Sequence, residues 1–176
     1  MEKEINLDTK NMQVNFYYDF IEVDDSKINH IRESLSLLLK GYGDFLSETL
    51  KLKKKFIINI NLIDNDKMIE INSTHRKINK VTDVLSFPLQ ESIRADDYDK
   101  FLPEVELGDL FICDNVCLTQ ACEFDISYQD EFIHLCVHGF LHLCGYDHEI
   151  NKDEEKIMED LEVGMIQDIS SQKAKK

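Results

Sequence analysis

The sequence predicts an α+β fold: a single domain in which a mixed sheet of about four strands packs against helices. A chain of 176 residues fits one domain and is long enough to bury a core. Segments rich in β-branched residues alternate with segments whose apolar residues recur at helical spacing. Because no repeat or low-complexity tract divides the chain, we expect one domain over residues 1–169 and a disordered tail over residues 170–176.

The first half of the chain is predicted to alternate between strands and helices. Residues 14–23 are rich in aromatic and β-branched residues and indicate a strand. Residues 24–26 offer N-cap oxygens to a long amphipathic helix over residues 28–45. Apolar and polar residues alternate over residues 56–63, which predicts a strand with one buried face, and a short helix follows over residues 66–75.

The second half begins with two strands and a loop. Residues 83–88 indicate a strand, and Pro88 places it at a sheet edge or marks its end because proline cannot donate a ladder hydrogen bond. Residues 90–106 are polar and acidic and predict a mobile loop. A further strand is expected over residues 107–113, and a short helix over residues 116–124.

Two longer helices complete the prediction. Ser127 and the residues after it fit a capping-box start for a helix that buries apolar side chains and ends before Gly145, a residue with easy access to positive φ. Asn151 and Glu154 can cap a final helix that carries Leu161 and Met165 inward.

Composition limits the classes of function. The net charge of −15 and the sequence pI near 4.7 argue against a general nucleic-acid binder, because an acidic surface repels phosphates. A local basic groove stays possible, and the candidates are the lysines within residues 51–55 and the cations Arg76, Lys77 and Lys80. For the lysine run a solvated surface is the favoured interpretation.

The expected location is the cytoplasm. The charged N-terminus lacks the apolar region of a secretory signal, and no apolar run reaches transmembrane length. Five cysteines form no CxxC pair, so they are interpreted as small buried side chains in a reducing compartment, with Cys144 set apart because it lies beside a histidine cluster.

The segment from His138 to His148 predicts a metal site. His138 and His142 are four residues apart, so on a helix their imidazoles lie on one face. Gly145 allows the chain to leave the helix sharply and to return His148 to the same point. Three neutral imidazoles with a fourth position open to water are typical of catalytic zinc, although nickel, copper and cobalt also accept such donors.

The HxxxHxxGxxH spacing is that of the metzincin proteases with one change. In those enzymes a glutamate follows the first histidine and acts as general base, whereas this chain has Gly139. Peptide hydrolysis by that mechanism is therefore disfavoured. Phosphodiester cleavage is the alternative, provided that a cationic group stabilises the charge that develops on phosphorus.

The segment HGFLHLCGYDHE resembles the signature of the YbeY family, bacterial zinc-dependent endoribonucleases implicated in ribosomal RNA maturation and ribosome quality control. The resemblance extends upstream, because Arg76, the residues TDVLSFP at 82–88 and the residues LGD at 107–109 resemble family motifs in the expected order. It covers most of the chain from Asn72 to His148. The histidine motif with GYDH is highly specific, and the other two motifs gain weight together.

The resemblance implies one zinc ion per chain, bound by His138, His142 and His148, in a metal-hydrolase domain. It also implies a functional role for Arg76, whose guanidinium is always charged and can hold a phosphate through two hydrogen bonds. The implied activity is single-strand-directed cleavage in the 3′-end maturation of 16S ribosomal RNA, with ribosomes or small-subunit particles as partners and no membrane. His75, where the family often has an aromatic residue, and the acidic loop depart from the pattern and bear on substrate affinity.

Other polar residues near the motif keep alternative interpretations. His134 lies one turn before His138 and is interpreted as a neighbour of the site or a packing residue, not a fourth ligand. Asp147 and Glu149 flank His148, and each could orient a ligand, accept a proton or be a plain surface carboxylate. His75 and His30 are assigned no role in the chemistry.

Two other functions remain open from sequence. One is a metal-dependent hydrolase of another phosphoester, and the other is a ribosome-associated factor whose zinc is chiefly structural. The oligomeric state, the RNA site and the attacking nucleophile, water or the 2′-hydroxyl, are not encoded in any recognisable pattern.

Overall fold

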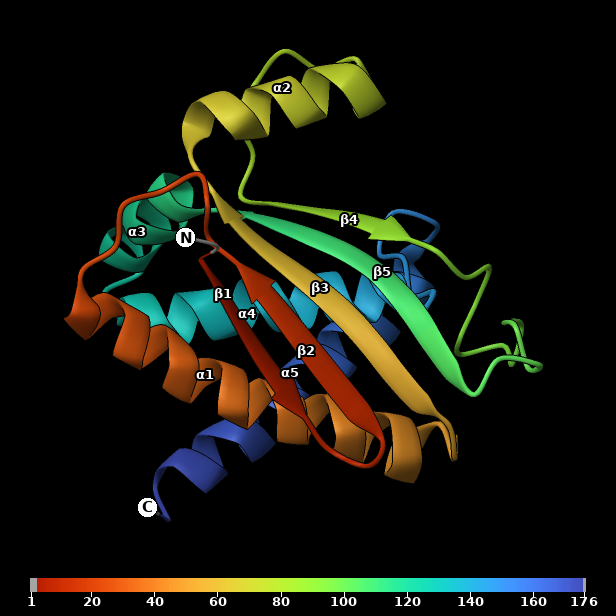
Figure 1. The fold of residues 1–176 in the computed structure, drawn as a ribbon. Helices are drawn as coiled ribbons and strands as arrows, with labels where there is room; N and C mark the ends of the chain where they lie inside the picture. The colour runs from red at the N-terminus through yellow and green to blue at the C-terminus, as the bar shows by residue number, and fades with distance from the viewer. Residues whose placement is uncertain (1–2, 176) are drawn as a thin grey trace.

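The computed structural model describes residues 3–175. Its five-stranded sheet has the order β1-β2-β3-β5-β4 (Figure 1). The strands are β1 (Glu4–Asp8), β2 (Met12–Tyr17), β3 (Lys55–Ile63), β4 (Val84–Pro88) and β5 (Glu104–Cys113). β2, β3 and β5 are parallel, whereas β1 and β4 pair antiparallel at the two edges. The predicted α+β class with one mixed sheet is confirmed.

Helices cover the two faces of the sheet unequally. They are α1 (Asp25–Asp44), the π-helical turn η1 (Phe45–Thr49), α2 (Asn65–Arg76), α3 (Asp114–Glu123), α4 (Tyr128–Leu143) and α5 (Lys152–Lys173). One large apolar core joins one face of the sheet to α1, α4 and α5. A smaller core joins the other face to α2, which stands apart at the top of Figure 1. The site on α4 therefore rests on the larger core.

N-cap residues that the sequence predicts mark the starts of α1, α4 and α5. Asp24 caps α1 by accepting a hydrogen bond from the Lys27 amide, and Ser127 caps α4 by accepting one from the Asp130 amide, as their sequences predict. Asn151 caps α5 in the same way. Pro88 is the last residue of edge strand β4, so both of its predicted meanings hold.

The structure differs from the sequence prediction at several boundaries. Strand β1 was not predicted, and β2 ends at Tyr17 although a strand was expected over residues 14–23. Strand β5 begins at Glu104, inside the expected loop, because Glu104 to Glu106 pair with β3. The expected tail over residues 170–176 is helical as far as Lys173, and residue 176 lies outside the described part of the chain.

Within residues 3–175, none of the helices combines the length and the apolar character that a membrane crossing requires.

Candidate metal centre

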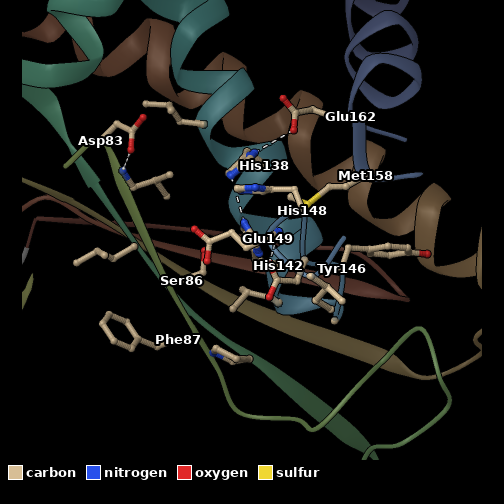
Figure 2. A pocket seen from close by; sticks show the side chains of 18 of the residues that line it. Asp83, Ser86, Phe87, His138, His142, Tyr146, His148, Glu149, Met158 and Glu162 are labelled. Atoms are coloured by element: carbon tan, nitrogen blue, oxygen red, sulfur yellow. Dashed lines mark hydrogen bonds and ion pairs between the residues drawn. The ribbon is translucent and has the colours of Figure 1, made fainter. Parts of the chain in front are cut away.

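The end of α4 and the turn after it bring the three histidines of the motif together. His138 and His142 project from one face of the helix, which ends at Leu143. Gly145 follows with φ of 96°, and its amide donates to the His142 carbonyl at 3.0 Å. A residue with a Cβ would be strained at this φ. The sharp exit returns His148 to the face that carries the other two imidazoles, as Figure 2 shows.

The donor atoms of these histidines suit a single metal ion. One ligand atom from each imidazole lies within 4.8 Å of the other two. The Nε2 atoms of His138 and His142 are 3.2 Å apart, and two nitrogens bound to one tetrahedral zinc are about 3.3 Å apart. Three nitrogen donors, partly buried and converging, therefore fit the predicted metal.

The surroundings of His142 favour the neutral form of its imidazole. Burial lowers the pKa of His142, and the neighbouring imidazoles of His138 and His148 lower it further. A metal ligand must offer a free nitrogen lone pair, so a lowered pKa favours the form that binds.

A carboxylate from α5 contacts the histidines of α4. The Oε2 atom of Glu162 lies 3.0 Å from Nδ1 of His138, and its Oε1 atom lies 2.8 Å from Nε2 of His134. Burial would raise the pKa of Glu162, but hydrogen bonds from His134 and His138 outweigh this and lower it to about 2. Glu162 is therefore ionised whenever the protein is folded near neutral pH.

Gly139 has no room for a side chain. A Cβ at Gly139 would lie 2.8 Å from the side chain of Leu110 and 3.2 Å from the hydroxyl of Ser86. The backbone of α4 thus approaches the sheet at the position where the metzincins carry their glutamate. The missing general base follows from the packing of α4 on β4 and β5.

The three histidines line a cleft of about 960 Å³. Strand β4 forms one wall, α4 and its turn another, and α5 a third (Figure 2). Arg76 lines the same cleft from the end of α2. Its side chain is exposed and forms no ion pair with any residue of the described range 3–175. The cleft also holds seven carboxylates, namely Asp83, Glu91, Asp147, Glu149, Glu155, Glu159 and Glu162.

Comparison with known proteins shows the family to which the chain belongs. The family model described as Endoribonuclease YbeY matches residues 20–170. The chain belongs to the endoribonuclease YbeY family. That match spans every element from α1 to the last turn of α5 and includes the three histidines, Arg76 and Glu162.

Relatives support the same family over most of their length. The protein named Endoribonuclease YbeY of Oenococcus oeni is 37% identical over 140 residues, which cover 80% of this chain and 89% of that protein. The one of Mesoplasma florum is 35% identical over 140 residues and covers 79% of each chain. A Thermotoga maritima protein with a solution structure aligns with a TM-score of 0.57 and 22% identity over 91% of this chain and 92% of its own, which supports the fold.

The two carboxylates beside His148 differ in what they do. Asp147 accepts the backbone amide of Glu149 at 2.9 Å, so its carboxylate is used to shape the turn. Glu149 has an exposed side chain, and Figure 2 shows it reaching into the cleft between His142 and Ser86. Both carboxylates line the cleft, and Glu149 is the more exposed of the two.

Three further residues, His134, His75 and Cys144, make contacts that do not involve the predicted metal. His134 lies beside the site, where its Nε2 atom faces Glu162, and is not among the three converging donors. His75 packs against Phe87 with ring centroids 4.9 Å apart. Cys144 is fully buried, and burial raises the pKa of its thiol, so it is a core residue.

No pattern in the sequence points to Glu162 or to the buried Glu131. Glu162 lies 24 residues after His138, on a different helix, and no motif spacing links the two. A weak signal existed, because Glu162 directly follows Leu161 on the inward face predicted for the last helix. Only the packing of α5 on α4 makes the contact visible.

Proposed function

We propose that this chain is a zinc-dependent endoribonuclease that cuts single-stranded RNA in the cytoplasm during the 3′-end maturation of 16S ribosomal RNA and in ribosome quality control. The observation that carries the proposal is one cleft that holds three converging imidazoles and an unpaired guanidinium, in a chain of the endoribonuclease YbeY family. The family supplies the substrate class, and ribosomal small-subunit particles are the proposed partners.

His138, His142 and His148 would hold one zinc ion. Their nitrogen chemistry, their convergence within 4.8 Å and the 3.2 Å between two Nε2 atoms support this assignment. When bound, zinc supplies Lewis-acid chemistry at the phosphodiester. The residues of the chain then have three tasks: to hold the phosphate, to accept a proton and to select the strand.

Arg76 would hold the phosphate. A phosphodiester gains negative charge on its non-bridging oxygens as it reacts, and a guanidinium can bind two of them through paired hydrogen bonds. Arg76 is suited to this because its side chain is exposed in the cleft and forms no ion pair with any of residues 3–175. Because Arg76 lines the same cleft as the histidines, a phosphate held by its side chain would lie beside the metal position.

Glu149 would accept the proton of the attacking group. Its carboxylate is exposed and directed into the cleft, and it follows directly after His148. The role that a glutamate at the position of Gly139 fills in the metzincins would thus come from the other end of the motif. Asp147 would keep the turn in shape through its hydrogen bond to the Glu149 amide.

The charge of the cleft supports a single strand as substrate. Seven carboxylates line it, so its walls repel a backbone that is rich in phosphates. Among the described lining residues, the groups that can attract a phosphate are Arg76 and the metal position, since His134 is held between two carboxylates. One reactive phosphate on a flexible strand can reach these two points, whereas a duplex would bring many phosphates against the acidic walls.

The test is cleavage of a structured RNA with single-stranded stretches by metal-replete protein, with the His142→Ala variant beside it. We expect cuts within the single-stranded stretches and none from the variant. Intact RNA with turnover of a small phosphoester would point to another phosphoesterase. Binding of ribosomal particles without any turnover would point to an assembly factor.

The ends of the cleaved RNA identify the nucleophile. A 2′,3′-cyclic phosphate on the product would identify the 2′-hydroxyl as nucleophile, and a 5′-phosphate would identify water.

A further inference from the structure

Glu162 bridges two histidines of α4 from the neighbouring helix α5. One carboxylate oxygen lies 3.0 Å from Nδ1 of His138, and the other lies 2.8 Å from Nε2 of His134. The Glu162 side chain is only 17% exposed. Figure 2 shows it directly above His138, on the side of the imidazole away from His142.

We infer that Glu162 is a positioning residue that fixes the tautomer and direction of His138 for metal binding. An ionised carboxylate can only accept hydrogen bonds, so the Nδ1 atom that faces it must carry the proton. The Nε2 atom of His138 then keeps its lone pair, and this is the atom that lies 3.2 Å from Nε2 of His142. A carboxylate behind a ligand imidazole also raises the basicity of the nitrogen that binds the metal.

His134 and Glu131 in turn fix Glu162. Nδ1 of His134 lies 3.3 Å from both oxygens of Glu131, and its Nε2 atom faces Glu162. Nε2 of His134 faces the ionised Glu162 and therefore carries a proton, whereas burial raises the pKa of Glu131, which faces Nδ1. Hydrogen bonding to Glu162 raises the pKa of His134 to about 9, which agrees with this arrangement. Glu131 is itself only 1% exposed, so the row formed by Glu131, His134, Glu162 and His138 is anchored in the core of the protein.

This row gives α5 a part in the site although the helix supplies no metal ligand. The three converging donors come from α4 and the turn after it. A contact that served only to pack α5 on α4 would affect the stability of the fold and leave metal affinity unchanged. If Glu162 positions His138, its loss should instead weaken metal affinity more than it affects the stability of the fold. The two roles can therefore be separated by experiment.

The experiment measures zinc affinity by competition with a chromophoric chelator for the parental protein and three variants. Glu162→Leu removes the acceptor, whereas Glu162→Gln keeps an oxygen that can accept from His138. Glu159→Leu is the matched control, because Glu159 lines the same cleft from the same helix but is exposed. It removes an equal charge without touching a histidine. Melting temperatures of the metal-free proteins report on folding.

We expect Glu162→Leu to weaken zinc binding about 10- to 100-fold, the range typical when a partner of a ligand histidine is lost. Glu162→Gln should lose less than tenfold, and Glu159→Leu less than about threefold. In the metal-free parental protein, ¹⁵N NMR of the histidine side chains should show His138 as the Nδ1–H tautomer, with a mixture of tautomers in Glu162→Leu.

The inference rests on the proposed function, because it assumes that the three histidines bind metal. A parental protein that binds no zinc would refute the proposed metal site itself. A parental protein that binds zinc, with Glu162→Leu binding as tightly, would refute the positioning role alone. An affinity of Glu162→Gln as weak as that of Glu162→Leu would also overturn it, since the acceptor would then be irrelevant. The tautomer of His138 is read without metal and tests the same role independently.

Discussion

The backbone of Gly139 lies so close to Leu110 that a Cβ would come within 2.8 Å of its side chain. This contact separates the chain from the metzincin proteases, with which it shares the spacing of its histidines. The helix that carries His138 and His142 packs directly on the sheet at the residue between them. The close packing therefore determines both where the imidazoles stand and which general base is absent.

Replacing Gly139 tests this packing. We expect Gly139→Ala to lower the free energy of unfolding by roughly 1–3 kcal/mol, as overpacking of a core does, and Gly139→Glu to lose more without gaining peptidase activity. Urea denaturation measures both. Gly164→Ala is the control, because a Cβ there meets nothing within 4 Å and alanine in a helix gains about 0.5–1 kcal/mol over glycine. Equal stability of the Gly139→Ala and parental proteins would contradict the account.

Arg94 is expected to stabilise the turn that carries His148. Its guanidinium lies 4.7 Å from the ring centre of Tyr146 and 2.6 Å from Glu154, and its amide donates to the Cys144 carbonyl. We predict that Arg94→Ala costs about 1–3 kcal/mol of stability, from a charged hydrogen bond and a cation–π contact.

Limited proteolysis of the loop over residues 90–103 gives a second measurement, and cleavage should be faster in Arg94→Ala. Lys100→Ala is the control, since Lys100 pairs with Asp96 on the surface, where an ion pair contributes about 0–1 kcal/mol. A loop that is cut at the same rate in all three proteins would show that Arg94 does not hold it.

Arg76→Ala should reduce RNA cleavage by about 10²–10³-fold, the usual effect of losing one group that stabilises developing charge. Arg76→Lys should recover little, because lysine keeps the charge but lacks the planar pair of donors. Zinc content and melting temperature should stay at parental values, since the side chain is exposed and unpaired within residues 3–175. Lys80→Ala, an exposed cation outside the cleft, is the control. Parental cleavage by Arg76→Ala would place the phosphate elsewhere.

Stability should fall steeply above about pH 9. Burial raises the pKa of the thiols of Cys117, Cys136 and Cys144 in the folded protein. Above the pKa of an unfolded thiol, the unfolded chain releases protons that the folded chain keeps, so stability is lost as pH rises. Each such thiol contributes a slope of up to about 1.4 kcal/mol per pH unit. The urea midpoint between pH 8 and pH 10.5 measures this, and a flat profile would contradict it.

The parts of the fold that follow from local chemistry could be predicted, and those that depend on packing could not. The caps at Asp24 and Ser127 and the alternation along β3 are encoded within a few neighbouring residues. Strand β1 has only two apolar positions, Ile5 and Leu7, and forms through its pairing with β2. Two apolar residues are too few to distinguish a strand from a loop.

The same distinction holds for the site. The three histidines could be identified because a helix and a glycine turn are encoded in their spacing. Arg76 and its place in the cleft came from a family resemblance, since nothing in the local sequence links it to residues some sixty positions later. Glu162 and Arg94 act through contacts between elements, and such contacts leave no periodic pattern in the chain.

The most direct test of the central claim is a titration of metal-free protein with zinc while the rate of RNA cleavage is followed. If His138, His142 and His148 form one zinc site that the reaction requires, the rate rises from near zero and stops rising at one equivalent of zinc per chain. His142→Ala should give no rise at stoichiometric zinc. Cleavage that proceeds at full rate without metal, or a His142→Ala protein that follows the parental curve, would contradict the account.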